Sequence, residues 1–190
     1  MSKIRLRAGE AMSEDWKVVH GLLTGCCQAL FEGVGLTLTV IGKDASPARS
    51  GERLAAFIGF SGDEMRGAIT LDLPSALVAQ VHPSASARAL DKDDLCDWAG
   101  ELANQLLGRL KNSLTCYSVL LQLSTPSCVW GRMSHGTKLP PQGSVELHFS
   151  TGTDLLIVYF DAKLLKPIDF ANPISGAGGE QQSEGDALFF

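Results

Sequence analysis

The sequence predicts an α+β domain in which long amphipathic helices are layered against a mostly antiparallel β-sheet. Three observations lead to this class: two long segments with helical apolar periodicity, two hairpin-like pairs of apolar segments, and an order of helix, strands, two helices, strands. Hairpins require antiparallel pairing, and a helix with one apolar side must bury it against another layer. The 190 residues, 45% hydrophobic and 19% charged, match a single globular domain.

The first helix is expected to follow a short polar arm, residues 1–12, with Ser13 as its N-cap. Apolar residues then recur at helical spacing as far as Gly33 and Gly35, which suit a helix C-terminus. Residues 36–41 are apolar and β-branched, and they are expected to form the first strand.

A hairpin and a short helix are expected next. Residues 54–60 and 67–73 are the predicted strands, and residues 61–64 are the turn, in which Gly62 tolerates a positive φ. The short helix is predicted over residues 74–81.

The longest helix is predicted over residues 92–114. Asp91, Asp93 and Asp94 stand at its start, where capping side chains and negative charge are stabilising. A step of about 100° per residue separates two opposite sides. The apolar side, expected to face the core, contains Leu95, Ala99, Leu102, Ala103, Leu106, Leu110 and Leu114. The polar side contains Asp97, Glu101, Asn104, Gln105, Gly108, Lys111 and Asn112.

The last part of the domain is expected to return to the sheet. Residues 117–123 and 128–130 are predicted strand pieces, interrupted by a proline, and residues 133–143 are a proline-containing loop. A second hairpin joins residues 145–149 with residues 155–160.

The domain is therefore predicted to cover residues 13–171 and to be followed by a flexible tail. Residues 172–190 are rich in Gly, Ser, Gln and Glu, which bury too little apolar area to offset chain entropy. The tail ends in Leu188, Phe189 and Phe190, which would suit either a docking peptide or packing at the domain edge.

Composition argues against several functional classes. The net charge of −5 and the lack of a basic stripe disfavour nucleic-acid binding. No apolar run approaches the roughly 20 residues needed to cross a bilayer, so no membrane partner is expected. The five cysteines are odd in number and form no C-x-x-C, and no signal-peptide pattern opens the chain. We therefore expect a cytoplasmic protein whose thiols are reduced and pack as small core residues.

The polar side of the longest helix holds the candidate site. Glu101 and Asn104 are three residues apart, so they are neighbours separated by a rise of about 4.5 Å and can touch one partner together. Gly inside a helix costs about 1 kcal/mol relative to Ala, and Asn is a poor helix former, so stability alone favours neither Gly108 nor Asn104. A merely solvated face is the simple alternative, because E-x-x-N often occurs by chance in a chain of this length.

A longer string resembles the D-x3-E-x2-N helix signature of the CheC/CheX family of phosphatases, which act on phosphorylated response regulators. Residues 58–71 before the helix and residues 123–131 after it also match the family in order, so the resemblance spans roughly residues 14–164. The signature positions are Asp97, Glu101, Asn104 and the family's glycine, Gly108.

The chain departs from the family pattern in two places. Arg109 stands where the family often has Asn. The first helix has no E-x-x-N, because neither Glu14 nor Glu32 is followed three residues later by Asn. CheC-like members carry the signature on two helices and CheX-like members on one, so this chain is similar to the CheX-like branch. The resemblance also implies a CheC-like fold and a homodimer.

The resemblance implies an activity in chemotaxis or a related two-component pathway. The substrate would be the aspartyl phosphate of a CheY-like receiver domain, whose own Mg²⁺ and lysine neutralise the phosphoryl charge. Asn104 would position the attacking water, and Glu101 would dock the receiver lysine. Asp97, Gln105 and Gly108 would complete the partner-binding surface.

Other kinds of site receive little support from the sequence. No Cys shares a motif with a His, which a thiol nucleophile would need. No His, Cys or carboxylate spacing is typical of a metal site, so neither a metal nor a cofactor of its own is expected. The alternative that stays open is a non-catalytic module that binds or scaffolds a receiver through the same helix face.

Overall fold

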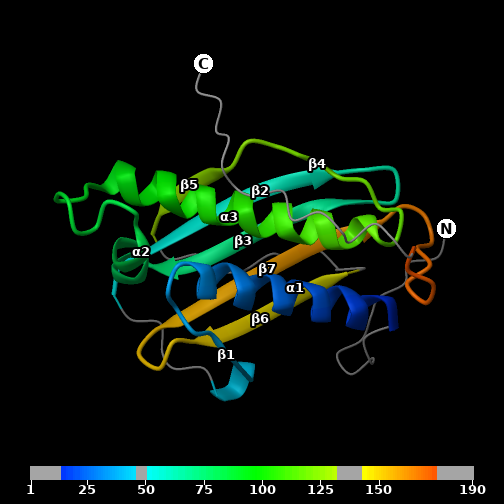
Figure 1. Ribbon diagram of the computed structural model, residues 1–190, viewed down its shortest axis with the longest axis horizontal. Helices are drawn as coiled ribbons and strands as arrows, with labels where there is room; N and C mark the ends of the chain where they lie inside the picture. The colour runs from blue at the N-terminus through cyan, green and yellow to red at the C-terminus, as the bar shows by residue number, and fades with distance from the viewer. Residues whose placement is uncertain (1–13, 46–50, 132–142, 175–190) are drawn as a thin grey trace.

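The computed structural model describes residues 14–45, 51–131 and 143–174. Within these ranges the chain forms one antiparallel sheet, and helices α1 (Glu14–Gly33) and α3 (Lys92–Thr115) lie side by side on one of its faces (Figure 1). The short helix α2 (Ser75–Val81) contacts α3 near its N-terminal end. This is the predicted α+β class, with long helices layered against an antiparallel sheet.

The sheet in the described part of the chain has seven strands. They are β1 (Thr39–Ile41), β2 (Arg53–Ser61), β3 (Met65–Pro74), β4 (Gln122–Leu123), β5 (Ser127–Trp130), β6 (Ser144–Ser150) and β7 (Leu155–Leu164). Their order is β1-β6-β7-β3-β2-β4, and β5 also pairs with β2. Both predicted hairpins are confirmed, because β2 pairs with β3 and β6 pairs with β7 in antiparallel register.

The first hairpin turns between Ser61 and Met65 as predicted, but its glycine is needed for a different reason. The φ angle of Gly62 is not positive, so the expectation for its backbone was wrong. A Cβ atom at this position would lie 2.3 Å from the carbonyl oxygen of Leu120. The close approach of the segment before β4 therefore excludes a side chain here.

The core lies between the sheet and the two long helices. The whole predicted apolar side of α3 is buried, and so are Leu23 and Phe31 of α1. They pack with Leu54 and Ile58 of β2 in one hydrophobic cluster. Burying a large apolar side chain contributes about 1.5–3 kcal/mol, so this contact fixes α3 against the sheet and leaves its polar side outward.

The first predicted strand is shorter than expected because its first residues terminate α1. The N–H of Leu36 donates to the carbonyl oxygen of Phe31 at 2.8 Å, and Gly35 has a φ of +82°, as in many helix C-termini. The side-chain amide of Gln28 donates a hydrogen bond to the carbonyl oxygen of Leu38. Only β1 remains of the predicted strand, because these groups are not available to a sheet ladder.

The predicted strand over residues 117–123 is shortened to β4 for the same reason. The N–H groups of Tyr117 and Val119 both donate to the carbonyl oxygen of Leu114, at 3.0 and 3.2 Å. Ser118 between them has a φ of +61°. These residues close the last turn of α3, and the chain joins the sheet only at Gln122 and Leu123.

Several expectations fall on residues that the structure does not describe. The polar arm, the Ser13 cap, most of the 133–143 loop and most of the tail lie outside the described ranges. The limits of the predicted domain and tail therefore stay predictions. None of the described helices is both long and apolar enough to cross a membrane.

Candidate functional site

The start of α3 is fixed by interactions of its own first residues. Asp91 is the N-cap: its carboxylate accepts from the N–H of Asp94 at 2.9 Å, and the Asp94 carboxylate accepts from the N–H of Asp91 at 3.0 Å. Arg88 also binds Asp94, and this contact, followed by the cap, holds the pKa of that carboxyl well below its usual range. The predicted cap is confirmed, and it fixes the N-terminus of the helix that carries the signature residues.

The outward side of α3 brings the signature residues together. Asp97 is exposed, whereas Glu101 and Asn104 are partly buried one helical turn apart. The Gln105 amide donates to Oε1 of Glu101 at 2.9 Å, so Gln105 holds this carboxylate along the helix surface. The carboxamide of Asn104 makes no hydrogen bond with any residue that the structure describes. The face thus presents a restrained carboxylate beside a carboxamide whose donor and acceptor are both available.

Gly108 extends this face with a bare stretch of backbone. A Cβ atom added there would meet no atom within 4 Å, so nothing within this chain excludes a side chain. Glycine at this place therefore serves neither a turn nor internal packing. It leaves room for the backbone of another molecule to come close to α3 beside Asn104.

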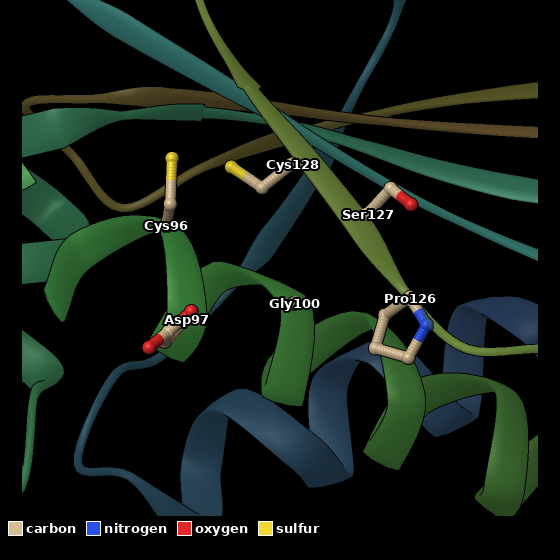
Figure 2. Close-up of a pocket in the computed structure, with 6 residues that line it drawn as sticks. All are labelled: Cys96, Asp97, Gly100, Pro126, Ser127 and Cys128. Atoms are coloured by element: carbon tan, nitrogen blue, oxygen red, sulfur yellow. The ribbon is translucent and has the colours of Figure 1, made fainter. Parts of the chain in front are cut away.

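A cleft of about 190 Å³ borders the signature face, between α3 and β5 (Figure 2). Gly100 lines it, and a Cβ added to Gly100 would be 3.6 Å from Pro126. The sequence pattern alone does not predict this cleft, although Gly100 within the signature and Pro126 after it are signals of it. The residues that line it are Cys96, Asp97, Gly100, Pro126, Ser127 and Cys128.

The five cysteines fall into two groups. Cys26 and Cys27 are buried in α1, as expected of small core residues, whereas Cys96, Cys116 and Cys128 are only partly buried. Burial raises the pKa of the Cys26 and Cys27 thiols. Burial, and next the Cys96 thiol, raise the pKa of Cys128 far above neutrality. The thiols of Cys26, Cys27 and Cys128 are therefore protonated at pH 7 and are poor nucleophiles.

The chemistry available on the signature face is binding and orientation. The ranges 14–45, 51–131 and 143–174 contain no group of three His, Cys, Asp or Glu residues placed to hold a metal ion. A neutral carboxamide can accept a proton of water with its oxygen and donate to an anionic oxygen with its nitrogen. A neighbouring carboxylate attracts a cation of a partner. The face thus suits a partner that brings an anion and a cationic side chain together.

Known proteins similar to this chain share its fold. The family model described as chemotaxis phosphatase CheX matches residues 54–149, just over half of the chain, including all of α3. No curated protein matches. The structure of the chemotaxis protein CheX from Vibrio vulnificus is 16% identical, with a TM-score of 0.64 over 82% of this chain and 100% of that chain.

Two further solved structures agree. A CheC-like superfamily protein from Shewanella sp. PV-4 is 15% identical, with a TM-score of 0.60 over 80% of this chain and 99% of that chain. A chain of the CheX–CheY–BeF₃–Mg²⁺ complex from Borrelia burgdorferi is 15% identical, with a TM-score of 0.57 over 75% of this chain and 96% of that chain. Similarity at these identities establishes the CheC-like fold.

Proposed function

Because this chain belongs to the chemotaxis phosphatase CheX family, we propose that it accelerates hydrolysis of the aspartyl phosphate of a CheY-like receiver domain. The observation that carries the proposal is the Asn104 carboxamide, which has no hydrogen bond to the described residues and stands one turn from the restrained carboxylate of Glu101. A surface optimised only for solvation has no need of this pair.

Asn104 is the catalytic residue of the proposal. On the receiver side, Mg²⁺ and a lysine neutralise the phosphoryl charge, and the Mg²⁺ belongs to the receiver rather than to this chain. The Asn104 oxygen accepts a proton of the attacking water and its nitrogen donates to a phosphoryl oxygen, which aligns the water with phosphorus. The bond between phosphorus and the aspartate oxygen breaks, which releases phosphate and the free carboxylate of the receiver.

Glu101 docks the receiver by pairing with its lysine. Gln105 is a positioning residue, because its hydrogen bond holds the Glu101 carboxylate on the side of α3 that faces the partner. Gly108 allows the receiver backbone to approach, and the exposed Asp97 orients the partner at the other end of the face. The site is one per chain, since α1 has no Glu followed by Asn at this spacing.

The cellular setting follows from the same family relation. A CheX structure from Borrelia burgdorferi holds CheY, BeF₃ and Mg²⁺, which supports a receiver as the partner of this chain also. We propose that this protein acts in the cytoplasm as a homodimer, in chemotaxis or a related two-component pathway, and binds neither nucleic acid nor membrane.

Asn104→Asp tests the mechanism. Aspartate has nearly the same shape, but it cannot donate to a phosphoryl oxygen and its charge repels the phosphoryl group. We expect the stimulated rate of receiver dephosphorylation to fall about 100-fold or more. Binding to the receiver loaded with BeF₃⁻ should largely survive, as measured by titration. Asn112→Asp makes the same change at an exposed position of the same helix and should keep the wild-type rate.

The dose dependence separates an enzyme from a binding module. Catalytic amounts of the wild-type protein should shorten the lifetime of the phosphorylated receiver. A non-catalytic scaffold would change this lifetime only in stoichiometric amounts. Asn104→Asp would then leave the rate of receiver dephosphorylation unchanged. Full activity of that variant would disprove the proposed role of Asn104.

A further inference from the structure

Two of the partly buried thiols meet in the cleft beside the signature face. Cys96 comes from the first turns of α3 and Cys128 comes from β5. The backbone of Cys128 pairs with that of Ala56 in β2, and Ala56 packs in the core beneath the helices, so the Cys128 side chain lies on the helix side of the sheet. Figure 2 shows its sulfur directed toward the sulfur of Cys96.

The cleft makes both sulfurs reachable by a small molecule. Its volume of about 190 Å³ exceeds the roughly 30 Å³ that one water occupies in the liquid several times over. The small side chain of Ser127 at its rim is exposed. Cys27, in contrast, is fully buried, and buried thiols are inert toward oxidants. Exposure thus distinguishes the pair in the cleft from the core thiols.

We propose that Cys96 and Cys128 are a site of peroxide oxidation, at which a disulfide forms between α3 and β5 next to Asp97. A peroxide first oxidises the Cys96 thiol to a sulfenic acid and leaves as water. The Cys128 sulfur then attacks the Cys96 sulfur, the S–O bond breaks, and a second water is released. One peroxide thus accepts the two electrons that the two thiols lose.

The state of Cys128 determines how fast this second step is. Burial raises the pKa of Cys128 and keeps it protonated at neutral pH, and only the thiolate attacks efficiently. Closure of the disulfide should therefore accelerate as pH rises from about 7 to 9, because the thiolate fraction grows. At neutral pH the disulfide should therefore form slowly and require sustained exposure to peroxide.

The disulfide would change the surface that the receiver meets. A sulfur–sulfur bond is about 2.05 Å long, so its formation holds α3 and β5 together across the cleft. Asp97 lines that cleft and Glu101 follows one turn later on the same helix. We expect receiver docking to weaken when the cleft is closed, a consequence that rests on the proposed function, whereas the oxidation itself does not.

Peptide mapping tests the site without reference to activity. The full-length reduced protein is treated with hydrogen peroxide at pH 8, its remaining thiols are alkylated, and it is digested without reductant. Before alkylation we expect the oxidised protein to be lighter than the reduced protein by about 2 Da, and after digestion we expect one linked peptide pair that contains Cys96 and Cys128. Cys96→Ser and Cys128→Ser should each remove the pair, and Cys116→Ser, at the far end of α3, should retain it. Failure of the wild-type protein to link these two cysteines would overturn the site.

Receiver binding tests the consequence separately. Oxidised and reduced proteins, freed of peroxide, are titrated with the receiver loaded with BeF₃⁻, and we expect the oxidised form to bind at least threefold more weakly. The double variant Cys96→Ser/Cys128→Ser should show no such difference. Equal affinities of the two wild-type forms would overturn the regulatory part. Absence of binding by the reduced form would instead contradict the proposed function, so the two failures are distinguishable.

Discussion

The two long helices cover the same face of the sheet but differ in what their polar sides do. On α1, Lys17 pairs with Glu14 at 2.6 Å, and Gln28 donates to the carbonyl oxygen of Leu38 at 3.3 Å. On α3, the Asn104 carboxamide has no hydrogen bond to the described residues. Amphipathicity therefore explains why both helices are buried on one side. Among the described residues of the two helices, only α3 presents a carboxamide that makes no hydrogen bond and stands beside a restrained carboxylate.

Bare glycine does not by itself distinguish the two helices. Gly21 and Gly25 of α1 are as open as Gly108 of α3, since an added Cβ would meet nothing within 4 Å at any of them. The difference lies in their neighbours. The Gln28 amide near Gly25 donates to the carbonyl oxygen of Leu38, whereas the Asn104 carboxamide near Gly108 makes no hydrogen bond to the described residues. An open glycine on a helix therefore indicates a surface for a partner only when such an unbonded polar side chain lies beside it.

The largest expected effect is one that the two helices share. Leu106→Ala in α3 and Leu23→Ala in α1 each remove a fully buried side chain from the same cluster. Each should lower the free energy of unfolding by about 2–5 kcal/mol. Denaturant titration measures this, and a much smaller loss for one helix would show that the two are not equally anchored to the sheet.

The second prediction separates the helices by their carboxylates. Glu101→Ala removes the group proposed to dock the receiver lysine and should weaken receiver binding by about 1.5–3 kcal/mol, or roughly 10-fold to 150-fold in Kd. Glu32→Ala removes an exposed carboxylate of α1 and should leave Kd unchanged. Isothermal titration decides between them, and equal effects of the two changes would refute the docking role.

Periodicity and turn chemistry predict most of the fold from the sequence. The bounds of α1 and α3 and both hairpins follow from apolar spacing, because burial of one side is a property of each segment alone. The shortened strands could not be predicted in this way. Leu36 and Val119 are apolar and suit strands, yet their N–H groups donate to the last turns of α1 and α3. Whether such a residue ends a helix or joins a strand depends on where the neighbouring chain lies.

The candidate site could be predicted only in part for a similar reason. Spacing places Glu101 beside Asn104, since three residues span about one helical turn. The hydrogen bond from Gln105 to Glu101 is visible only in the structure, and it adds the proposed positioning role to the predicted contact of Gln105 with the partner. The cleft forms only where α3 and β5 come together. The sequence alone therefore cannot predict that Cys96 and Cys128 lie opposite each other.

The third prediction uses the open glycines as a matched pair. Gly108→Ala and Gly21→Ala add a methyl group to the surface of a helix without a clash and should each stabilise the protein by up to about 1 kcal/mol. Only Gly108→Ala should also reduce receiver binding, because its methyl group occupies the space left for the partner backbone. Thermal unfolding and titration measure the two effects. If Gly108→Ala binds like the wild type, the close approach of the receiver is excluded.

The smallest expected effect concerns the start of α3 and its dependence on pH. The pKa of Asp94 is held below its unfolded value by Arg88 and by the cap, so its contribution is fully present above about pH 4, near the unfolded pKa of Asp. That contribution should be lost as the pH falls toward the lower pKa of the folded state. Between pH 5 and 2 we therefore expect Asp94→Asn to lose less thermal stability than the wild type. Asp93→Asn, which removes a charge from the same exposed helix terminus, should retain the acid sensitivity, because Asp93 takes no part in the cap. A wild-type slope that survives Asp94→Asn would show that α3 begins independently of this carboxylate.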